Sequence, residues 1–311
     1  MLIISNLNKL STKIEKKNTV ITVGVFDGVH RGHQQILHKT IAQTRKYPNS
    51  QSIVLTFQEH PLKILSSSIC PPLLLLNEEK VDHISEFGID IILNLHFTKQ
   101  FANLTATEFV TRILYKSFQV KEIIVGHDHG FGKNATGDVR LLEKFGQKLG
   151  FEVTVVIPVC YRNIPISSTR IREAILAGKV EDASAMLGRP HHIIGKVVKG
   201  DQRGRKLGFP TANLITKNEV IPGNGVYAVL VELLGKQYQG IMNIGFRPTF
   251  FKTAEPTLEV YLFNYQGNLY NKKLKIHFIT RLRDEKRFPT PEALLIQMKK
   301  DVLKAKQLLR T

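Results

Sequence analysis

The chain has 311 residues, 42% of them hydrophobic, and a formal net charge of +18 at pH 7. This length suits about two domains, and the hydrophobic fraction excludes a globally disordered chain. The charge suits anionic partners, which are nucleic acid, phosphate-rich small molecules or an acidic membrane surface, but it also fits a solvated basic surface with no such role.

At the amino-terminal end the apolar stretch is too short for a signal peptide, and no run of about 18 apolar residues predicts a transmembrane helix. The cysteines Cys70 and Cys160 are too few for a disulfide framework or a four-cysteine zinc site. We therefore expect a cytoplasmic protein in a reducing compartment, without association with a membrane.

From residue 19 to about residue 187, short apolar runs alternate with helical patterns. The runs typical of buried strands are 19–26, 52–57, 89–95, 120–126 and 151–157. The helical patterns are 33–47, 138–150 and 168–178, and glycine ends the last two. This alternation predicts a doubly wound, Rossmann-like α/β domain.

After the sequence LGRP (187–190) the pattern becomes all-β. The β-rich runs are 192–200, 225–235, 236–245, 258–265 and 274–283, and Gly, Asn and Pro lie between them. Such spacing predicts an antiparallel barrel or sandwich. The change from alternating strands and helices to an all-β pattern gives the predicted domains, 1–186 and 187–311.

One helix is expected to close the chain. Thr290 can cap it, and Pro291 suits the first helical position. The apolar residues that follow at steps of three and four are Leu295, Met298, Val302, Ala305 and Leu309. We expect this stripe to pack on the core of the second domain.

The stretch GVFDGVHRGHQQIL (24–37) places glycines and histidines where the first strand ends and a helix begins. Doubly wound folds bind ligands at this edge. His30 and His33 are three residues apart, so they share one face beside the free N–H groups of the helix start, which suits a polyphosphate. Gly28 and Gly32 would let the backbone approach a nucleotide closely.

Other interpretations of this stretch stay open from the residues alone. The two histidines could bind zinc, although no third ligand is near in sequence, or they could simply be solvated. The fingerprint G-x-G-x-x-G is absent, and in GKNATGD (132–138) Asp138 replaces the lysine of a P-loop. Asp27 is either a turn former or a ligand contact.

The strip G-x-F-D-G-x-H-x-G-H (24–33) resembles the first signature of the nucleotidylyltransferase superfamily, and ISSTRIR (166–172) resembles the second. The FDG of the first motif, with LTFQEHP (55–61) and GHDHGFGKNATGD (126–138), resembles the bacterial bifunctional riboflavin kinase/FMN adenylyltransferase family, also called FAD synthetase. In the last of these blocks His129 replaces a common aromatic residue.

The second domain resembles the same family independently. GRKLGFPTANL (204–214) is similar to the riboflavin kinase motif, and 258–288 is similar to the block that carries the kinase base. The resemblance covers nearly the whole chain in the family's order. It implies that riboflavin is phosphorylated to FMN and that FMN is then adenylylated to FAD, with ATP and Mg²⁺ as cofactors.

For the first domain the resemblance implies that His30 and His33 bind the ATP phosphates and act in catalysis. It places these further residues at the ATP site: Gly24, Phe26, Asp27, Ser168, Thr169 and Arg172. Thr169 could instead only cap its helix. The FMN phosphate is already an anion, so its attack on ATP needs no base, and positioning and charge stabilisation should dominate.

For the second domain the resemblance implies that Glu259 is the catalytic base that removes a proton from the ribityl hydroxyl of riboflavin. It also places Gly208, Pro210, Thr211 and Asn213 at the ATP and flavin site. Thr211 and Asn213 offer hard oxygen donors, which suit Mg²⁺.

Two other classes of function remain as alternatives. The charge of +18 would suit a nucleic-acid-binding module, and the same pockets would suit a flavin-carrying redox protein. We expect riboflavin, FMN and ATP as the partners and no nucleic acid. The sequence makes no prediction of the oligomeric state.

Overall fold

The computed structural model describes residues 1–6, 18–66, 70–200, 208–246 and 256–310. The chain forms two compact units, Met1–Ser168 and Thr169–Thr311. The predicted domain boundary, at residue 187, lies later in the chain than this spatial division. The segment between the two positions carries α7 (Ser168–Leu176) and α8 (Val180–Leu187).

The first unit is built on a sheet with the strand order β1-β4-β3-β2-β5-β6. Its strands are β1 (Leu2–Ile4), β2 (Asn18–Val23), β3 (Ser50–Phe57), β4 (Ile91–Leu95), β5 (Val120–Gly126) and β6 (Glu152–Val156). All neighbouring pairs in this sheet are parallel. The order reverses at β2, which lies between β3 and β5, so the switch point that doubly wound folds use for ligands is its carboxyl end.

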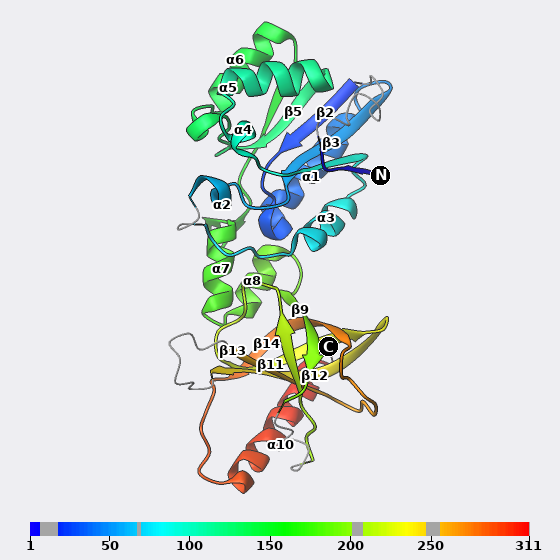
Figure 1. Ribbon diagram of the computed structural model, residues 1–311, viewed down its shortest axis with the longest axis vertical. Coiled ribbons are helices and arrows are strands. Elements are labelled where there is room, and N and C mark those ends of the chain that lie inside the picture. The colour runs from blue at the N-terminus through cyan, green and yellow to red at the C-terminus, as the bar shows by residue number, and fades with distance from the viewer. Residues whose placement is uncertain (7–17, 67–69, 201–207, 247–255, 311) are drawn as a thin grey trace. The chain divides into compact units, whose positions relative to one another are not determined.

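Helices cover both faces of this sheet (Figure 1). The helices of this unit are α1 (Arg31–Thr44), α2 (Leu62–Leu65), α3 (Asn77–Ser85), α4 (Lys99–Ala102), α5 (Ala106–Glu108), the π-helix η4 (Phe109–Ser117) and α6 (Val139–Leu149). On β3, Val54 packs with Leu37 of α1 and Ile84 of α3. Its neighbour Leu55 belongs to the core on the opposite face with Phe109 of η4. A strand buried on both faces needs an unbroken apolar run, which explains the runs in the sequence.

The predicted elements of the first domain are confirmed. Each of its predicted apolar runs overlaps a strand, and the helical patterns 33–47 and 138–150 overlap α1 and α6. Helix α6 is capped by Asp138, whose carboxylate accepts the N–H of Leu141 at 2.8 Å. Strand β1 was not predicted, because its three residues are too few to show the alternation typical of a strand.

The second unit contains a closed antiparallel barrel with the strand order β10-β13-β12-β11-β14-β9. Its strands are β9 (His192–Val198), β10 (Ala212–Thr216), β11 (Gly225–Leu233), β12 (Lys236–Phe246), β13 (Pro256–Leu262) and β14 (Lys273–Arg283). The sequence predicts either a barrel or a sandwich, and the chain adopts the barrel. Val229, Met242, Val260 and Phe278 fill its interior and are fully buried.

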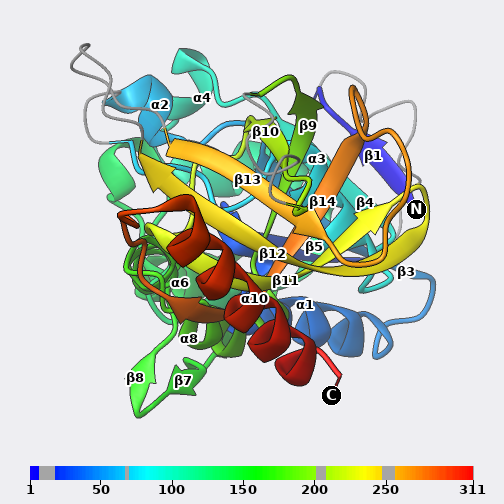
Figure 2. The same cartoon turned by 90° about the horizontal axis from the view of Figure 1, so that it is seen from below.

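The terminal helix α10 (Pro291–Leu308) begins where the sequence predicts, because the Thr290 hydroxyl accepts the N–H of Ala293 at 3.2 Å. The helix lies along the outer wall of the barrel (Figure 2). Ala305 is fully buried there, and Val302 packs against the same cluster, which contains Phe263 of the segment after β13. Val302, Ala305 and Leu309 of the predicted apolar stripe therefore pack on the second unit, as expected.

Helices α7 and α8 belong to the barrel unit by their contacts. The N–H of Gly223 donates to the carbonyl of Ile175 at 3.1 Å. Val180, the first residue of α8, is fully buried in the barrel core. The Thr280 hydroxyl of β14 also donates to the carboxylate of Glu181. Helical residues before position 187 therefore help to complete the barrel.

Candidate functional sites

A pocket of about 270 Å³ lies at the carboxyl ends of the central strands of the first unit. Val23 at the end of β2, Gly126 at the end of β5 and Val156 at the end of β6 line it. These ends meet because β2, β5 and β6 are consecutive in the sheet. The pocket therefore occupies the switch point, where the sequence predicts ligand binding.

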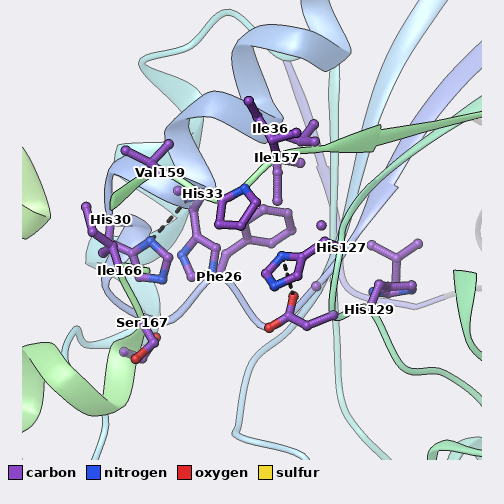
Figure 3. Close-up of a pocket in the computed structure, with 18 residues that line it drawn as sticks. Phe26, His30, His33, Ile36, His127, His129, Ile157, Val159, Ile166 and Ser167 are labelled. Carbon is purple, nitrogen blue, oxygen red and sulfur yellow. Dashed lines mark hydrogen bonds and ion pairs between the residues drawn. The ribbon is translucent and has the colours of Figure 1, made fainter. Parts of the chain in front are cut away.

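His30 and His33 stand together at one side of this pocket (Figure 3). Their rings are stacked, with 3.6 Å between the centroids and an interplanar angle of 15°. His30 caps α1, because its Nδ1 accepts the backbone N–H of His33 at 3.3 Å. An imidazole that accepts through Nδ1 carries its proton on Nε2 when neutral. The predicted placement of both histidines at the helix start is confirmed.

The environment of His33 keeps its side chain neutral. Burial, together with the nearby His30 and Lys80, lowers the pKa of His33 well below its ordinary value. Its Nδ1 is buried without a hydrogen-bond partner among the described residues. A buried, unsatisfied nitrogen at a pocket wall costs free energy unless a ligand or water meets it. A ligand or a water molecule in the pocket would satisfy this nitrogen, and the contact of His33 with ATP stays a prediction.

The turn after β2 is fixed by its own contacts. Asp27 is 4% exposed, and its carboxylate accepts the N–H of Leu74 at 3.0 and 3.3 Å. Gly28 has φ +80°, a conformation that other residues rarely adopt. Phe26 is buried, and its ring meets that of His33 at 5.2 Å in an edge-to-face arrangement. Asp27 therefore anchors the segment before α3, and a contact with ATP stays a prediction.

The two sequence signatures of the first domain meet at this pocket. The Ser168 hydroxyl donates to the backbone carbonyl of Asp27 at 2.9 Å. Ser168 and Gly24 both line the pocket, as predicted for ATP-site residues. Thr169 and Arg172 continue along α7 and belong to the second unit. Their predicted contacts with ATP remain predictions.

The pocket has further walls, formed by residues that the sequence did not predict at the ATP site. His127 and His129 line it after β5, and Ile157 and Val159 line it after β6. Burial lowers the pKa of His129 to about 4, and its ring stacks on that of Phe131 with centroids 5.8 Å apart. These residues follow strands that were predicted, so the signal was the position after each apolar run. The sequence did not show the strand order that brings these strand ends together.

Lys80 of α3 is a second residue that sequence reasoning missed. It is 6% exposed, and its ammonium donates to the backbone carbonyl of Phe57 at the end of β3. Burial lowers the pKa of Lys80 to about 8, against the opposite effect of the Asp27 and Glu59 carboxylates. Asp27 and Lys80 are thus buried opposite charges beside the histidines.

In the barrel unit, the predicted kinase residues gather on neighbouring strands. Asn213 of β10 lies directly opposite Glu259 of β13. Both point to the outside of the barrel, since Leu214 and Val260 beside them are part of its interior. Gly208, Pro210 and Thr211 precede β10 in the described chain, whereas residues 204–207 of the predicted motif lie outside the described residues. The structure therefore brings the predicted base next to a predicted metal ligand.

The Asn213 side chain lies directly against the backbone of Gly200. A Cβ atom built on Gly200 would lie 2.0 Å from Nδ2 of Asn213, so glycine is needed for this side chain to occupy its place. An amide oxygen, a threonine hydroxyl and a carboxylate on adjacent positions are hard donors that suit Mg²⁺. The donor atoms of Thr211, Asn213 and Glu259 are therefore of the type that binds Mg²⁺.

The fold and these two sites define a two-domain transferase that uses nucleotides. Two family models match the chain: FAD synthetase over residues 12–170 and riboflavin kinase over residues 187–309. No helix in the described part of the chain has the length and apolar character needed to cross a membrane.

Curated relatives cover nearly the whole chain. The bifunctional riboflavin kinase/FMN adenylyltransferase of Escherichia coli (strain K12) is 37% identical over 308 residues, which is 99% of this chain and 97% of that one. The protein of the same name from Buchnera aphidicola subsp. Schizaphis graminum is 37% identical over 302 residues, with 96% and 95% covered. A crystal structure described as a macrolide-efflux protein from Streptococcus pneumoniae shares the fold over 98% of both chains, with a TM-score of 0.87 and 31% identity.

The chain therefore belongs to the family of bifunctional riboflavin kinase/FMN adenylyltransferases. The resemblance found in the sequence is confirmed, and so are the two activities, with riboflavin, FMN, FAD and ATP as substrates and products.

Proposed function

We propose that the pocket at the end of β2 carries the FMN adenylyltransferase reaction and that the outer wall of the barrel around Glu259 carries the riboflavin kinase reaction. The stacked pair His30 and His33 at the switch point is the observation that supports the first assignment most directly. For the second, the support is the pairing of Glu259 with Asn213 across β13 and β10.

In the adenylyltransferase reaction, an oxygen of the FMN phosphate attacks the α-phosphorus of ATP. A new P–O bond forms, the bond to the β-phosphate oxygen breaks, and pyrophosphate leaves. His30 and His33 donate hydrogen bonds to phosphate oxygens whose charge grows in the transition state, and His33 does so as a neutral imidazole. Gly24 and Ser168 shape the site beside them, and Thr169 and Arg172 bind the phosphates further along α7, with arginine able to act bidentately.

In the kinase reaction, the Glu259 carboxylate accepts the proton of the ribityl hydroxyl. The hydroxyl oxygen bonds to the γ-phosphorus of ATP, the bond from this phosphorus to the oxygen shared with the β-phosphate breaks, and ADP leaves. Thr211 and Asn213 hold Mg²⁺, which neutralises phosphate charge when bound. Gly208 and Pro210 shape the turn that approaches the phosphates.

The remaining assignments follow from the same scheme. The functional boundary is placed at residue 187, where the riboflavin kinase match begins. The net charge of +18 serves to attract ATP and FMN rather than nucleic acid. Both cysteines are free thiols, which supports a reducing cytoplasmic location.

One experiment tests the scheme as a whole. The purified protein is incubated with riboflavin, ATP and Mg²⁺, and the products are separated by chromatography. FMN should appear first and FAD afterwards, and omission of Mg²⁺ should stop FMN formation. A protein that binds RNA in a strongly salt-dependent way and turns over no ATP would contradict it.

A further inference from the structure

Asn243 of β12 lies on the side of Glu259 opposite Asn213. The register pairs Glu259 with Asn213 of β10 and, on the other edge of β13, with Asn243. Met242 and Ile244 beside Asn243 belong to the barrel interior, so the Asn243 side chain points outward like that of Glu259. The carboxylate is therefore flanked by two amides in one row across three strands.

Of the two residues directly opposed to Asn243 in the sheet, one is polar. On its other edge, β12 pairs Asn243 with Val226 of β11, which is 4% exposed and packs in the apolar cluster beneath α10. Directly opposed residues on neighbouring strands have Cβ atoms about 4.5–5.5 Å apart, which an asparagine amide and a glutamate carboxylate can bridge. The polar partner across the sheet is therefore Glu259.

The Asn243 amide is available for that contact. It is half-buried, and it makes no side-chain hydrogen bond in the part of the chain that the structure describes. A half-buried amide that makes no hydrogen bond costs free energy. Hydrogen bonds of a catalytic group often become well aligned only in the complex with substrate, so a lone amide beside a base suits a contact made during the reaction.

A second carboxylate fixes which end of the amide is needed. A Cβ built on Gly245 would lie 2.1 Å from Oε1 of Glu285, so that carboxylate lies against the strand two residues from Asn243 on the same face. Asn243 is therefore close to two acceptors, Glu259 across the sheet and Glu285 along its own strand. The NH₂ group, with two hydrogens to donate, is the half of the amide that suits this place.

We propose that Asn243 is a positioning residue of the kinase site, whose amide holds the Glu259 carboxylate in the orientation that accepts the substrate proton. The proposal rests on the assignment of Glu259 as the base. Asn213 acts at the metal, and Asn243 acts on the carboxylate from the other edge of the strand. A misaligned reacting group can cost about 10²-fold in rate.

A double-mutant cycle on the full-length protein tests this proposal. Kinase turnover is measured for wild type, Asn243→Ala, Glu259→Gln and the double variant. Asn243→Ala should lower kcat by roughly tenfold to 10²-fold, with little change in the KM for riboflavin. In the Glu259→Gln background the same substitution should cost almost nothing, because there is no carboxylate left to orient.

Two further variants exclude a merely structural effect. Asn243→Asp has the same shape but cannot donate, so it should lose at least as much kcat as Asn243→Ala. Gln237→Ala removes an exposed amide from the same strand and face, opposite Glu232 rather than Glu259, and should keep wild-type kinase turnover. FAD formation from supplied FMN should be unchanged in all of them, because that reaction belongs to the first unit, and thermal unfolding followed by circular dichroism checks that the barrel of each variant is folded.

The outcomes separate the proposal from its premise. Near-normal turnover of Glu259→Gln would overturn the assignment of the base and this proposal with it. An equal loss from Asn243→Ala in both backgrounds, or a rise in KM with kcat intact, would instead make Asn243 a substrate contact and overturn only its positioning role. A wild-type kcat in Asn243→Asp would also overturn the positioning role of Asn243.

Discussion

The Ser168 hydroxyl donates a 2.9 Å hydrogen bond to the backbone carbonyl of Asp27, which is 141 residues earlier in the chain. This bond joins the second signature of the first domain to the turn that carries the histidines. The carboxylate of the same Asp27 accepts the N–H of Leu74. One buried residue thus connects three segments around the pocket, and the position of the histidines depends on those contacts.

Ser168→Ala should weaken the adenylyltransferase reaction modestly. The loss of one net hydrogen bond is worth about 0.5–1.5 kcal/mol, so kcat/KM for ATP in FAD formation should fall by roughly two- to twelvefold. Ser168→Thr keeps the hydroxyl and should retain more activity. Steady-state rates with supplied FMN measure both variants, and equal rates for the two would refute a role for the hydroxyl.

His33→Ala should turn the protein into an enzyme that accumulates FMN. The loss of one preorganised donor costs about 10²–10³-fold in a comparable electrostatic site, so FAD formation should fall by that factor while kinase turnover persists. Chromatography of products from riboflavin and ATP measures both steps at once. Metal in the purified wild type that is lost in the variant would support the zinc alternative, and undiminished FAD output would leave His33 without a role.

Glu259→Gln should weaken the kinase reaction and leave the adenylyltransferase reaction intact. The substitution keeps the shape of the side chain and removes the base, so kinase turnover should fall by about 10²–10⁴-fold. FAD formation from supplied FMN should survive, because that reaction belongs to the first unit. The ratio of the two rates is the measurement. A parallel fall in both rates would indicate misfolding rather than loss of a base.

The first unit should lose stability on acidification partly through His129. Its pKa is about 4 in the folded state, against about 6.5 in the unfolded chain. Between these values the unfolded state binds more protons, so the free energy of unfolding falls as the pH drops below 6.5, by at most about 1.4 kcal/mol per pH unit for this group. His33, whose pKa is also lowered, adds to the same trend.

His129→Phe should therefore be less sensitive to acid than wild type. The chain contains no tryptophan, so urea unfolding is best followed by circular dichroism, at pH 7 and pH 5. The control is His127→Phe, at a neighbouring side chain that is 51% exposed. If His129→Phe lost as much stability between the two pH values as wild type, the lowered pKa of His129 would be disproved.

A fragment that begins at residue 169 should be a more stable kinase than one that begins at residue 187. The shorter fragment loses Val180 from the barrel core and the bond from Gly223 to Ile175. Fragment 169–311 should make FMN and never FAD, and 187–311 should melt at a lower temperature. Thermal unfolding and riboflavin turnover compare them, and equal melting temperatures would show that α7 and α8 are dispensable.

The sequence by itself determined the local structure and the kind of chemistry. Apolar runs such as 52–57 became buried strands because a strand covered on both faces is largely apolar. The spacing of His30 and His33, after a strand and before a helix, was enough to place both at a helix start. Glu259 and Asn213 were found through motifs, which are local patterns as well.

The tertiary structure alone decided which distant segments meet. The order of the parallel sheet brings His127 and His129 beside the first histidines, and barrel register places Asn243 next to Glu259. A periodic pattern fixes the element and the face on which a residue lies, but it leaves the strand's neighbours open. Those neighbours are selected by packing between segments far apart in the chain, so Asn243 and Lys80 became visible only in the folded molecule.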